Sequence, residues 1–142
     1  MKILQKAKGK IGMKIMVIVA HPELLKSRAN QVLSLELKKY ADFFVRDLYQ
    51  EYPNWNIDVE REQQLLLEYE RIVFQFPMYW YSCPPLLKKW FDDVLTYGWA
   101  FGPGGENLQG KQFVVATTTG GLDLKYSQDP SKSVVRPIIA RD

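Results

Sequence analysis

Apolar residues are grouped along this chain in a way that predicts alternating strands and helices. The segment 13–20 becomes continuously apolar after Lys14 and is rich in β-branched residues, which is typical of a strand buried on both faces of a parallel sheet. Shorter runs of the same kind predict three more strands, at 43–48, 72–76 and 113–118.

The connections between these runs have helical spacing. Ser27 can cap a helix over 28–41, Asp58 can cap a helix that runs to Tyr69, and Pro84-Pro85 opens a third helix. The apolar positions expected to face the core are Ala29, Val32, Leu33, Leu37 and Tyr40 in the first helix, Leu65, Leu66 and Leu67 in the second, and Leu86, Leu87, Trp90, Phe91, Val94 and Leu95 in the third.

Strands that alternate with helix-length connections predict an α/β fold with a doubly wound parallel sheet. Ligands of such sheets bind outside the carboxyl ends of the strands, where the strand order reverses. The chemically distinctive residues follow three of the predicted strands, at 21–30, 77–85 and 118–126. We therefore expect a ligand site where these three segments meet.

Composition excludes several other kinds of protein. The 142 residues suit one domain, and a net charge of +3 falls short of the clustered excess of a nucleic-acid binder. A single cysteine, Cys83, and a single histidine, His21, exclude a disulfide framework and a metal site built from several of these residues. The longest uncharged run, 72–87, is interrupted by Gln75, Ser82 and three prolines, so it is not a membrane-spanning helix.

The first twelve residues differ from the rest. They are basic but lack the apolar core of a secretory signal, so we expect 1–12 to be an extension outside the fold and the protein to be cytoplasmic. The folded domain is then expected over 13–142.

The segment after the first predicted strand has the components of a phosphate site. The beginning of a helix offers free backbone N–H groups and the positive end of its dipole, and hydroxyl, guanidinium and imidazole groups lie nearby in the sequence. The candidate ligands are His21, Ser27, Arg28, Ala29 and Asn30. No Gly-x-Gly-x-x-Gly or Walker sequence is present, and an ordinary N-cap with a solvated arginine explains the same residues.

Two further segments could hold a planar ring. Pro77-Met78-Tyr79-Trp80-Tyr81 offers aromatic side chains and backbone amides beside a strand end, although aromatic clusters are also common in cores and interfaces. Thr118-Thr119-Gly120-Gly121 offers hydroxyls, and glycines that let the backbone approach a ligand closely. Tyr126 could donate a proton to a bound ring or be an ordinary half-buried tyrosine.

Together these motifs resemble the flavodoxin-like NAD(P)H:quinone oxidoreductases. The resemblance rests on Ala20-His21-Pro22 with the segment 27–30, on 76–82 followed by 84–88, and on the segments 98–102 and 118–121, in the family's order and spacing. It extends from residue 13 to about 127. It is greatest for the short bacterial branch, which includes general-stress quinone reductases and ancillary flavoproteins of glutathione-gated potassium-efflux systems.

The resemblance implies a non-covalent flavin, which is FMN rather than FAD in most short members. His21 and the segment 27–30 would hold its phosphate, 78–81 would lie along the isoalloxazine ring, and 118–121 would contact its other edge. Tyr126 would lie over the flavin as the catalytic side chain. The implied reaction is a two-electron, ping-pong hydride transfer from NAD(P)H through flavin N5 to a quinone. Backbone amides near Trp80 and Thr119 would stabilise the negative charge of the reduced flavin.

The resemblance also implies partners. Family members are homodimers with the active site at the interface, and the alternative function is a flavin-binding regulatory subunit of a potassium-efflux transporter. A flavodoxin-type electron carrier fits less well, because such carriers are usually acidic. The family continues with another strand and helix beyond the point that corresponds to Asp142, so we expect a flavodoxin-like sheet truncated after its fourth strand.

Overall fold

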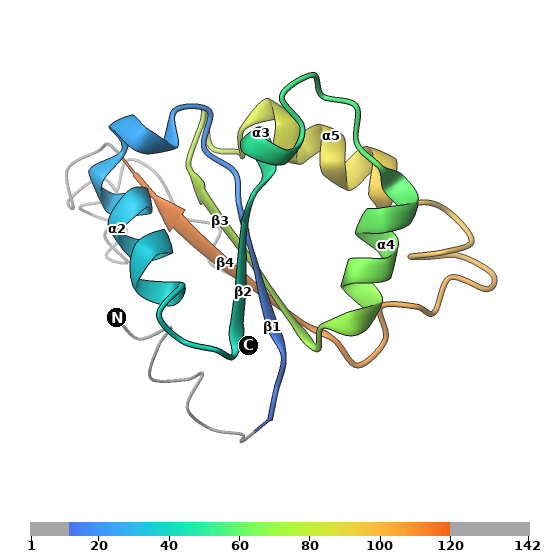
Figure 1. The fold of residues 1–142 in the computed structure, drawn as a ribbon. Coiled ribbons are helices and arrows are strands. Elements are labelled where there is room, and N and C mark those ends of the chain that lie inside the picture. The colour runs from blue at the N-terminus through green and yellow to red at the C-terminus, as the bar shows by residue number, and fades with distance from the viewer. Residues whose placement is uncertain (1–11, 120–142) are drawn as a thin grey trace, which may run out of the picture.

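A four-stranded parallel sheet with helices on both faces makes up the part of the chain that the computed structural model describes, residues 12–119 (Figure 1). The strand order is β2-β1-β3-β4, with every neighbouring pair parallel, which confirms the predicted doubly wound α/β fold. In chain order the elements are β1 (Ile15–Val19), the 3-10 helix η1 (Leu24–Lys26), α2 (Arg28–Leu37), β2 (Phe43–Asp47), α3 (Leu48–Glu51), α4 (Val59–Glu68), β3 (Arg71–Pro77), α5 (Pro85–Val94) and β4 (Gln112–Thr118). Most of the expected extension 1–12, and the candidate residues Gly120, Gly121 and Tyr126, lie outside the described residues.

The central strand β1 is buried along its whole length, as its continuous apolar run predicted. It pairs with β2 on one side and with β3 on the other, so that Val17 lies between Val45 and Val73. The chain continues from β1 to β2 on one side of the sheet and from β3 to β4 on the other. The strand order therefore reverses between β1 and β3. The reversal places the expected ligand-binding edge at the carboxyl ends of β1 and β3.

Helices form one layer on each face of the sheet. In Figure 1, α2 lies on one face with η1 beside it, whereas α4 and α5 lie on the other. The larger core lies under α4 and α5 and includes Met16, Ile18, Leu66, Phe74 and Trp90. The smaller core, under α2, includes Ile15, Val17, Val19, Leu37 and Val73.

The orientation and length of α2 differ from the prediction. The helix ends at Leu37 rather than at residue 41, and its buried side chains are Asn30, Ser34 and Leu37. Val32 is 59% exposed, and Tyr40, beyond the helix end, is also exposed. Of the expected apolar set, Leu37 is buried and Leu33 packs against the smaller core, as predicted, but Ala29 is exposed like Val32 and Tyr40. The prediction failed at these three positions because polar side chains of α2 find hydrogen-bond partners in the sheet and turn inward.

The helices on the opposite face agree better with their patterns. Leu86, Leu87, Trp90 and Val94 of α5 are buried as predicted, and Phe91 and Leu95 pack at the edge of the same core. In α4, Leu66 is buried and Leu65 packs against the core, but Leu67 is exposed, which corrects the expected inward set. The short helix α3 was not predicted; the Asp47 carboxylate caps it by accepting hydrogen bonds from the amides of Tyr49 and Gln50.

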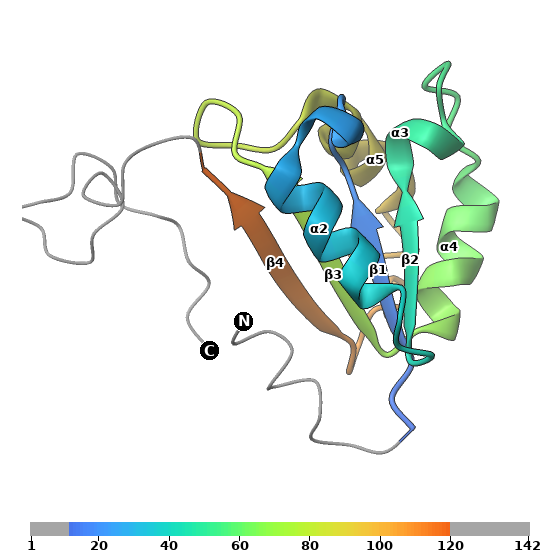
Figure 2. The ribbon, with the colours of Figure 1, turned by 60° about the vertical axis from the view of Figure 1, so that its left-hand side comes forward.

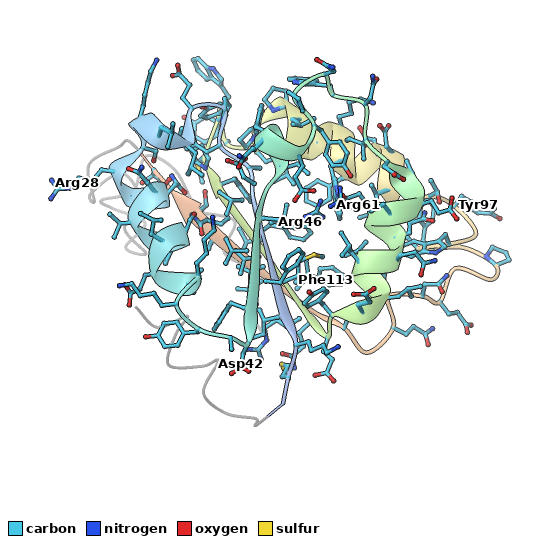
Figure 3. All side chains as sticks on the ribbon, in the orientation of Figure 1. Arg28, Asp42, Arg46, Arg61, Tyr97 and Phe113 are labelled. Carbon is cyan, nitrogen blue, oxygen red and sulfur yellow. The ribbon has the colours of Figure 1, made fainter. Side chains whose placement is uncertain are left out.

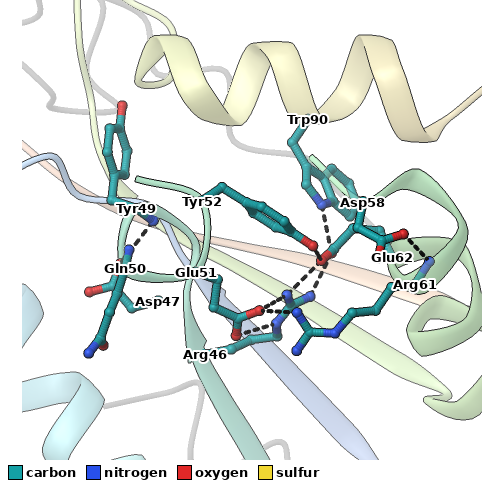
Figure 4. Close-up of polar contacts among 10 residues, drawn as sticks. All are labelled: Arg46, Asp47, Tyr49, Gln50, Glu51, Tyr52, Asp58, Arg61, Glu62 and Trp90. Carbon is teal, nitrogen blue, oxygen red and sulfur yellow. Dashed lines mark hydrogen bonds and ion pairs between the residues drawn. The ribbon is translucent and has the colours of Figure 1, made fainter. Parts of the chain in front are cut away.

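A buried ion pair connects β2 to α4 and α5 (Figure 4). Glu62 accepts hydrogen bonds from Arg46 Nη1 at 2.6 Å, Tyr52 Oη at 2.6 Å and Trp90 Nε1 at 2.8 Å. Arg46 also contacts the Glu51 carboxylate. Burial alone would raise the pKa of Glu62, but the hydrogen bonds and charge of Arg46 outweigh it and hold this pKa below its ordinary value. Each charge is thus paired, which is the condition for burying it.

No helix within residues 12–119 is long and apolar enough to cross a membrane.

Candidate functional site

Segments that follow β1 and β3 meet the end of β4 at one edge of the sheet, as the sequence predicted. Asn30 Nδ2 donates to Thr118 Oγ1 at 3.0 Å, which joins the start of α2 to the end of β4. The Met78 amide donates to the Thr118 carbonyl at 2.8 Å, which joins the segment after β3 to the same point. Figure 2 shows the N-terminus of α2, the loop after β3 and the carboxyl end of β4 along this edge.

Two hydroxyl groups of this edge are held in a defined hydrogen-bonding state. Ser27 Oγ accepts hydrogen bonds from Asn30 Nδ2 at 2.9 Å and from the Asn30 amide at 3.4 Å. Thr118 Oγ1 accepts a hydrogen bond from the same nitrogen, Asn30 Nδ2, at 3.0 Å. A hydroxyl has one hydrogen to donate, and neither of these two donates it to an atom of residues 12–119. Both hydroxyls can therefore donate to an anion.

The first turn of α2 adds backbone donors. The amide N–H groups of Arg28 and Ala29 have no acceptor within the helix, and the dipole places its positive end here. The Arg28 side chain is exposed, and Figure 3 shows it pointing away from the sheet. The structure thus brings the Arg28 backbone to the expected phosphate position but leaves its guanidinium in solvent.

His21 lies at the end of β1 with its neutral form favoured. Its Nδ1 accepts a hydrogen bond from the Glu23 amide at 2.9 Å, which places the proton of the neutral ring on Nε2. Partial burial lowers the pKa of His21, against the opposing charges of Glu23 and Asp47. At neutral pH the residue is therefore a hydrogen-bond donor through Nε2 rather than a full positive charge.

The aromatic segment after β3 forms a tight hairpin. Tyr79 and Ser82 exchange backbone hydrogen bonds of 3.1 and 2.9 Å, and Trp80 and Tyr81 occupy the two central positions with φ of 48° and 63°. This left-handed geometry belongs to a type I′ turn, which favours asparagine and glycine, so two aromatic residues are strained there. Trp80 is 94% exposed. Strained, exposed aromatic residues at a sheet edge are more typical of ligand contact than of packing.

The remaining candidates divide into those placed at this edge and those outside the described residues. Pro77 ends β3 and pairs with Thr118, and Thr119 follows β4 with an exposed side chain. The roles expected for Gly120, Gly121 and Tyr126 remain predictions, because these residues lie outside 12–119.

One polar residue next to the site was missed as a candidate. Gln75 is fully buried in β3, and its Nε2 donates to the Asn30 carbonyl at 3.0 Å and to Ser34 Oγ at 3.2 Å. In the sequence it is noticeable only as a polar interruption of an apolar strand, which is the signal that could have found it.

A hollow of about 610 Å³ lies beside this edge, toward β2. His21 and Ser34 line it together with carboxylates of Glu23 and Asp47 and ammonium groups of Lys26 and Lys38. Its lining therefore has no excess of either charge, in contrast to the donor-rich edge at Ser27, Asn30 and Thr118.

The parallel order β2-β1-β3-β4 and a site at the carboxyl ends of its strands define a flavodoxin-like α/β protein. A family profile described as flavodoxin-like fold matches residues 13–138, and the chain belongs to this family.

Two curated relatives carry functional names. The chain is 58% identical over 114 residues to the uncharacterized NAD(P)H oxidoreductase YrkL of Bacillus subtilis, covering 80% of this chain and 66% of the relative. It is 46% identical over 129 residues to the glutathione-regulated potassium-efflux system ancillary protein KefG of Escherichia coli, covering 87% of this chain and 70% of the relative. The chain thus spans about two thirds of the length of these relatives.

Solved structures show the same fold. General stress protein 14 of Treponema denticola, in complex with FMN, superposes with a TM-score of 0.79 at 41% identity, over 83% of this chain and 68% of that protein. An NADPH-quinone reductase of P. pentosaceus superposes with a TM-score of 0.73 at 34% identity, over 85% of this chain and 69% of that protein.

Proposed function

We propose that this protein binds FMN and catalyses the two-electron reduction of a quinone by NAD(P)H. The observation that carries the proposal is the Ser27–Asn30–Thr118 cluster, which joins two segments of the predicted flavin site through one amide group. The FMN complex and the quinone reductase named above are similar to this chain and support the choice of cofactor and acceptor.

The residues present fit a flavin phosphate. A phosphate monoester needs several hydrogen-bond donors, and the edge offers the Ser27 and Thr118 hydroxyls and backbone amides of the first turn of α2. The neutral His21 ring at the end of β1, although it lies near the Glu23 and Asp47 carboxylates, would add one more donor through Nε2. The hairpin at 79–82 offers exposed aromatic surface and backbone for a ring system.

In this proposal the protein supplies binding and orientation. FMN, when bound, would carry a hydride from NAD(P)H to the quinone, and a proton from solvent completes the hydroquinone. The phosphate would be held by Ser27, Thr118 and the backbone amides of α2. Holding the phosphate there would fix how far the isoalloxazine ring lies from the helix. Trp80 and Tyr81 would border the ring on the solvent side, where a nicotinamide or a quinone has to enter. Tyr126 remains the predicted side chain that would pass this proton from solvent to the quinone.

The visible spectrum of the purified full chain tests this function. After FMN is added and unbound flavin is removed, we expect flavin absorption to remain with the protein, to decay when NADPH or NADH is added without oxygen, and to return when a soluble quinone follows. A chain that retains neither FMN nor FAD would overturn the proposal.

We also expect a homodimer, as the resemblance implied. Large apolar side chains are exposed on the described part of the chain, among them Trp80, Tyr97 and Phe101. Sedimentation or light scattering of the FMN-loaded protein measures the mass directly, and a monomer at micromolar concentration would contradict the expectation.

Similarity to KefG supports a second candidate, a flavin-binding subunit that regulates a potassium-efflux transporter. This alternative predicts FMN binding with little quinone turnover, together with flavin-dependent association with membranes that contain such a transporter. Rapid quinone turnover without membrane association would favour the enzyme.

A further inference from the structure

Gln75 is a fully buried amide on the face of the sheet that α2 covers. It is paired with Val19 of β1 and Ala116 of β4, so it lies within the sheet rather than at an edge. Its Oε1 has no hydrogen-bond partner among the described residues. A buried unpaired acceptor is unfavourable, so packing alone would favour an apolar side chain of this size.

The other end of this amide has a fixed orientation. Gln75 Nε2 lies 3.0 Å from the Asn30 backbone carbonyl, an atom that can only accept. The same nitrogen lies 3.4 Å from Asn30 Oδ1 and 3.2 Å from Ser34 Oγ. The backbone carbonyl therefore determines that Gln75 presents N–H groups, and not its oxygen, to α2.

The orientation of Gln75 sets that of Asn30. Because Gln75 presents donors, the Asn30 atom that faces it is the acceptor Oδ1, and Nδ2 is turned toward Ser27 and Thr118. Both hydroxyls then accept from Asn30 and keep their hydrogens for a ligand. With the Asn30 amide reversed, Oδ1 would lie beside the hydroxyls and would draw those hydrogens away from the site.

We propose that Gln75 is a positioning residue for a phosphate monoester: through Asn30 it makes Ser27 and Thr118 present hydrogens rather than lone pairs to the ligand. The inference rests on the proposed function and adds to it a determinant of selectivity for FMN over riboflavin, which has the same ring system but no phosphate.

The test compares two flavins on the full chain and on Gln75→Met, which conserves volume and removes the amide. Flavin fluorescence quenching measures both dissociation constants. We expect the dissociation constant of FMN to rise about tenfold, which corresponds to the loss of one charge-assisted hydrogen bond. The dissociation constant of riboflavin should change by less than about twofold. The melting temperature should stay within about 4 °C of the parent, because the substitution also removes an unpaired acceptor.

Val73→Ala is the matched control, since Val73 lies on the same strand and faces the same core but has no polar side chain. It should lower the melting temperature and leave the ratio of FMN to riboflavin affinity unchanged. An unchanged ratio in Gln75→Met would overturn the inference alone. A parent chain that binds FMN no more tightly than riboflavin would overturn the phosphate site together with it. If neither Gln75→Met nor Gln75→Leu folds, the inference about Gln75 is also overturned, because the role of Gln75 would then be to stabilise the core.

Discussion

Asn30 Nδ2 lies 3.0 Å from Thr118 Oγ1, although 88 positions separate the two residues in the sequence. This contact closes the edge at which β1, β3 and β4 end, and it joins the candidate phosphate-binding helix to the last described strand.

Thr118→Val should weaken FMN binding about tenfold, because it removes a hydroxyl that can donate to a charged phosphate and leaves one Asn30 hydrogen unpaired. Riboflavin binding should change by less than about twofold. Titration of both flavins measures the difference. Thr117→Val is the control, because Thr117 points to the opposite face of β4 and is exposed. Equal losses for the two flavins in Thr118→Val would contradict a phosphate contact.

The strained hairpin predicts opposite effects on stability and binding. Replacing its central residues by the turn-favouring pair, Trp80→Asn with Tyr81→Gly, should raise the free energy of unfolding by about 1–2 kcal/mol. The same double variant should weaken flavin binding, since it removes the exposed aromatic surface. Urea denaturation and flavin titration measure the two effects.

Trp55→Asn provides the comparison for the hairpin, because Trp55 also has a positive φ, of 61°, but lies in the connection between α3 and α4. Flavin affinity should be unaffected there. Unaltered flavin binding in the hairpin variant would show that its rings serve another purpose.

Glu62→Gln should lower the free energy of unfolding by about 3 kcal/mol, because it removes the charge that Arg46 faces in a fully buried position. Asp92→Asn breaks an exposed pair with Lys88 and should cost less than about 1 kcal/mol. Chemical denaturation compares the two variants with the parent. Similar small decreases in the free energy of unfolding for both variants would indicate that Glu51 alone compensates the buried charge of Arg46.

The same carboxylate predicts a pH dependence of stability. The pKa of Glu62 is lower in the folded chain than its ordinary value of 4.5, so the folded state binds fewer protons than the unfolded state. The contribution of ionised Glu62 to the free energy of unfolding is therefore complete above pH 4.5 and is lost as the pH falls through the pKa of the folded state. The stability difference between the parent and Glu62→Gln should narrow as the pH is lowered from 7 to 3. A stability difference that stays constant over this pH range would show that the pKa of Glu62 is not lowered by folding.

Local signals in the sequence were enough for the order of the strands and main helices and for the sheet edge at which the candidate segments meet. The apolar run of β1 predicted a doubly buried strand, Ser27 and Asp58 cap the helices expected after them, and alternation of strands and helices placed the three unusual segments at one edge. These features depend on neighbours within a few residues, so they can be read along the chain. The early end of α2 and the short helix α3 depend on the packing and capping around them and were not anticipated.

Only the tertiary structure decided which side chains of those elements work together. Periodicity assigned Val32 to the interior, yet Val32 is exposed, whereas the polar side chains of Asn30 and Ser34 are buried. Gln75, more than 40 positions away, donates hydrogen bonds to the Asn30 carbonyl and to Ser34 Oγ. The pairing of Arg46 with Glu62 arises in the same way. A buried polar group is stable only beside a complementary partner, and which distant residue supplies it is determined by how the strands and helices pack.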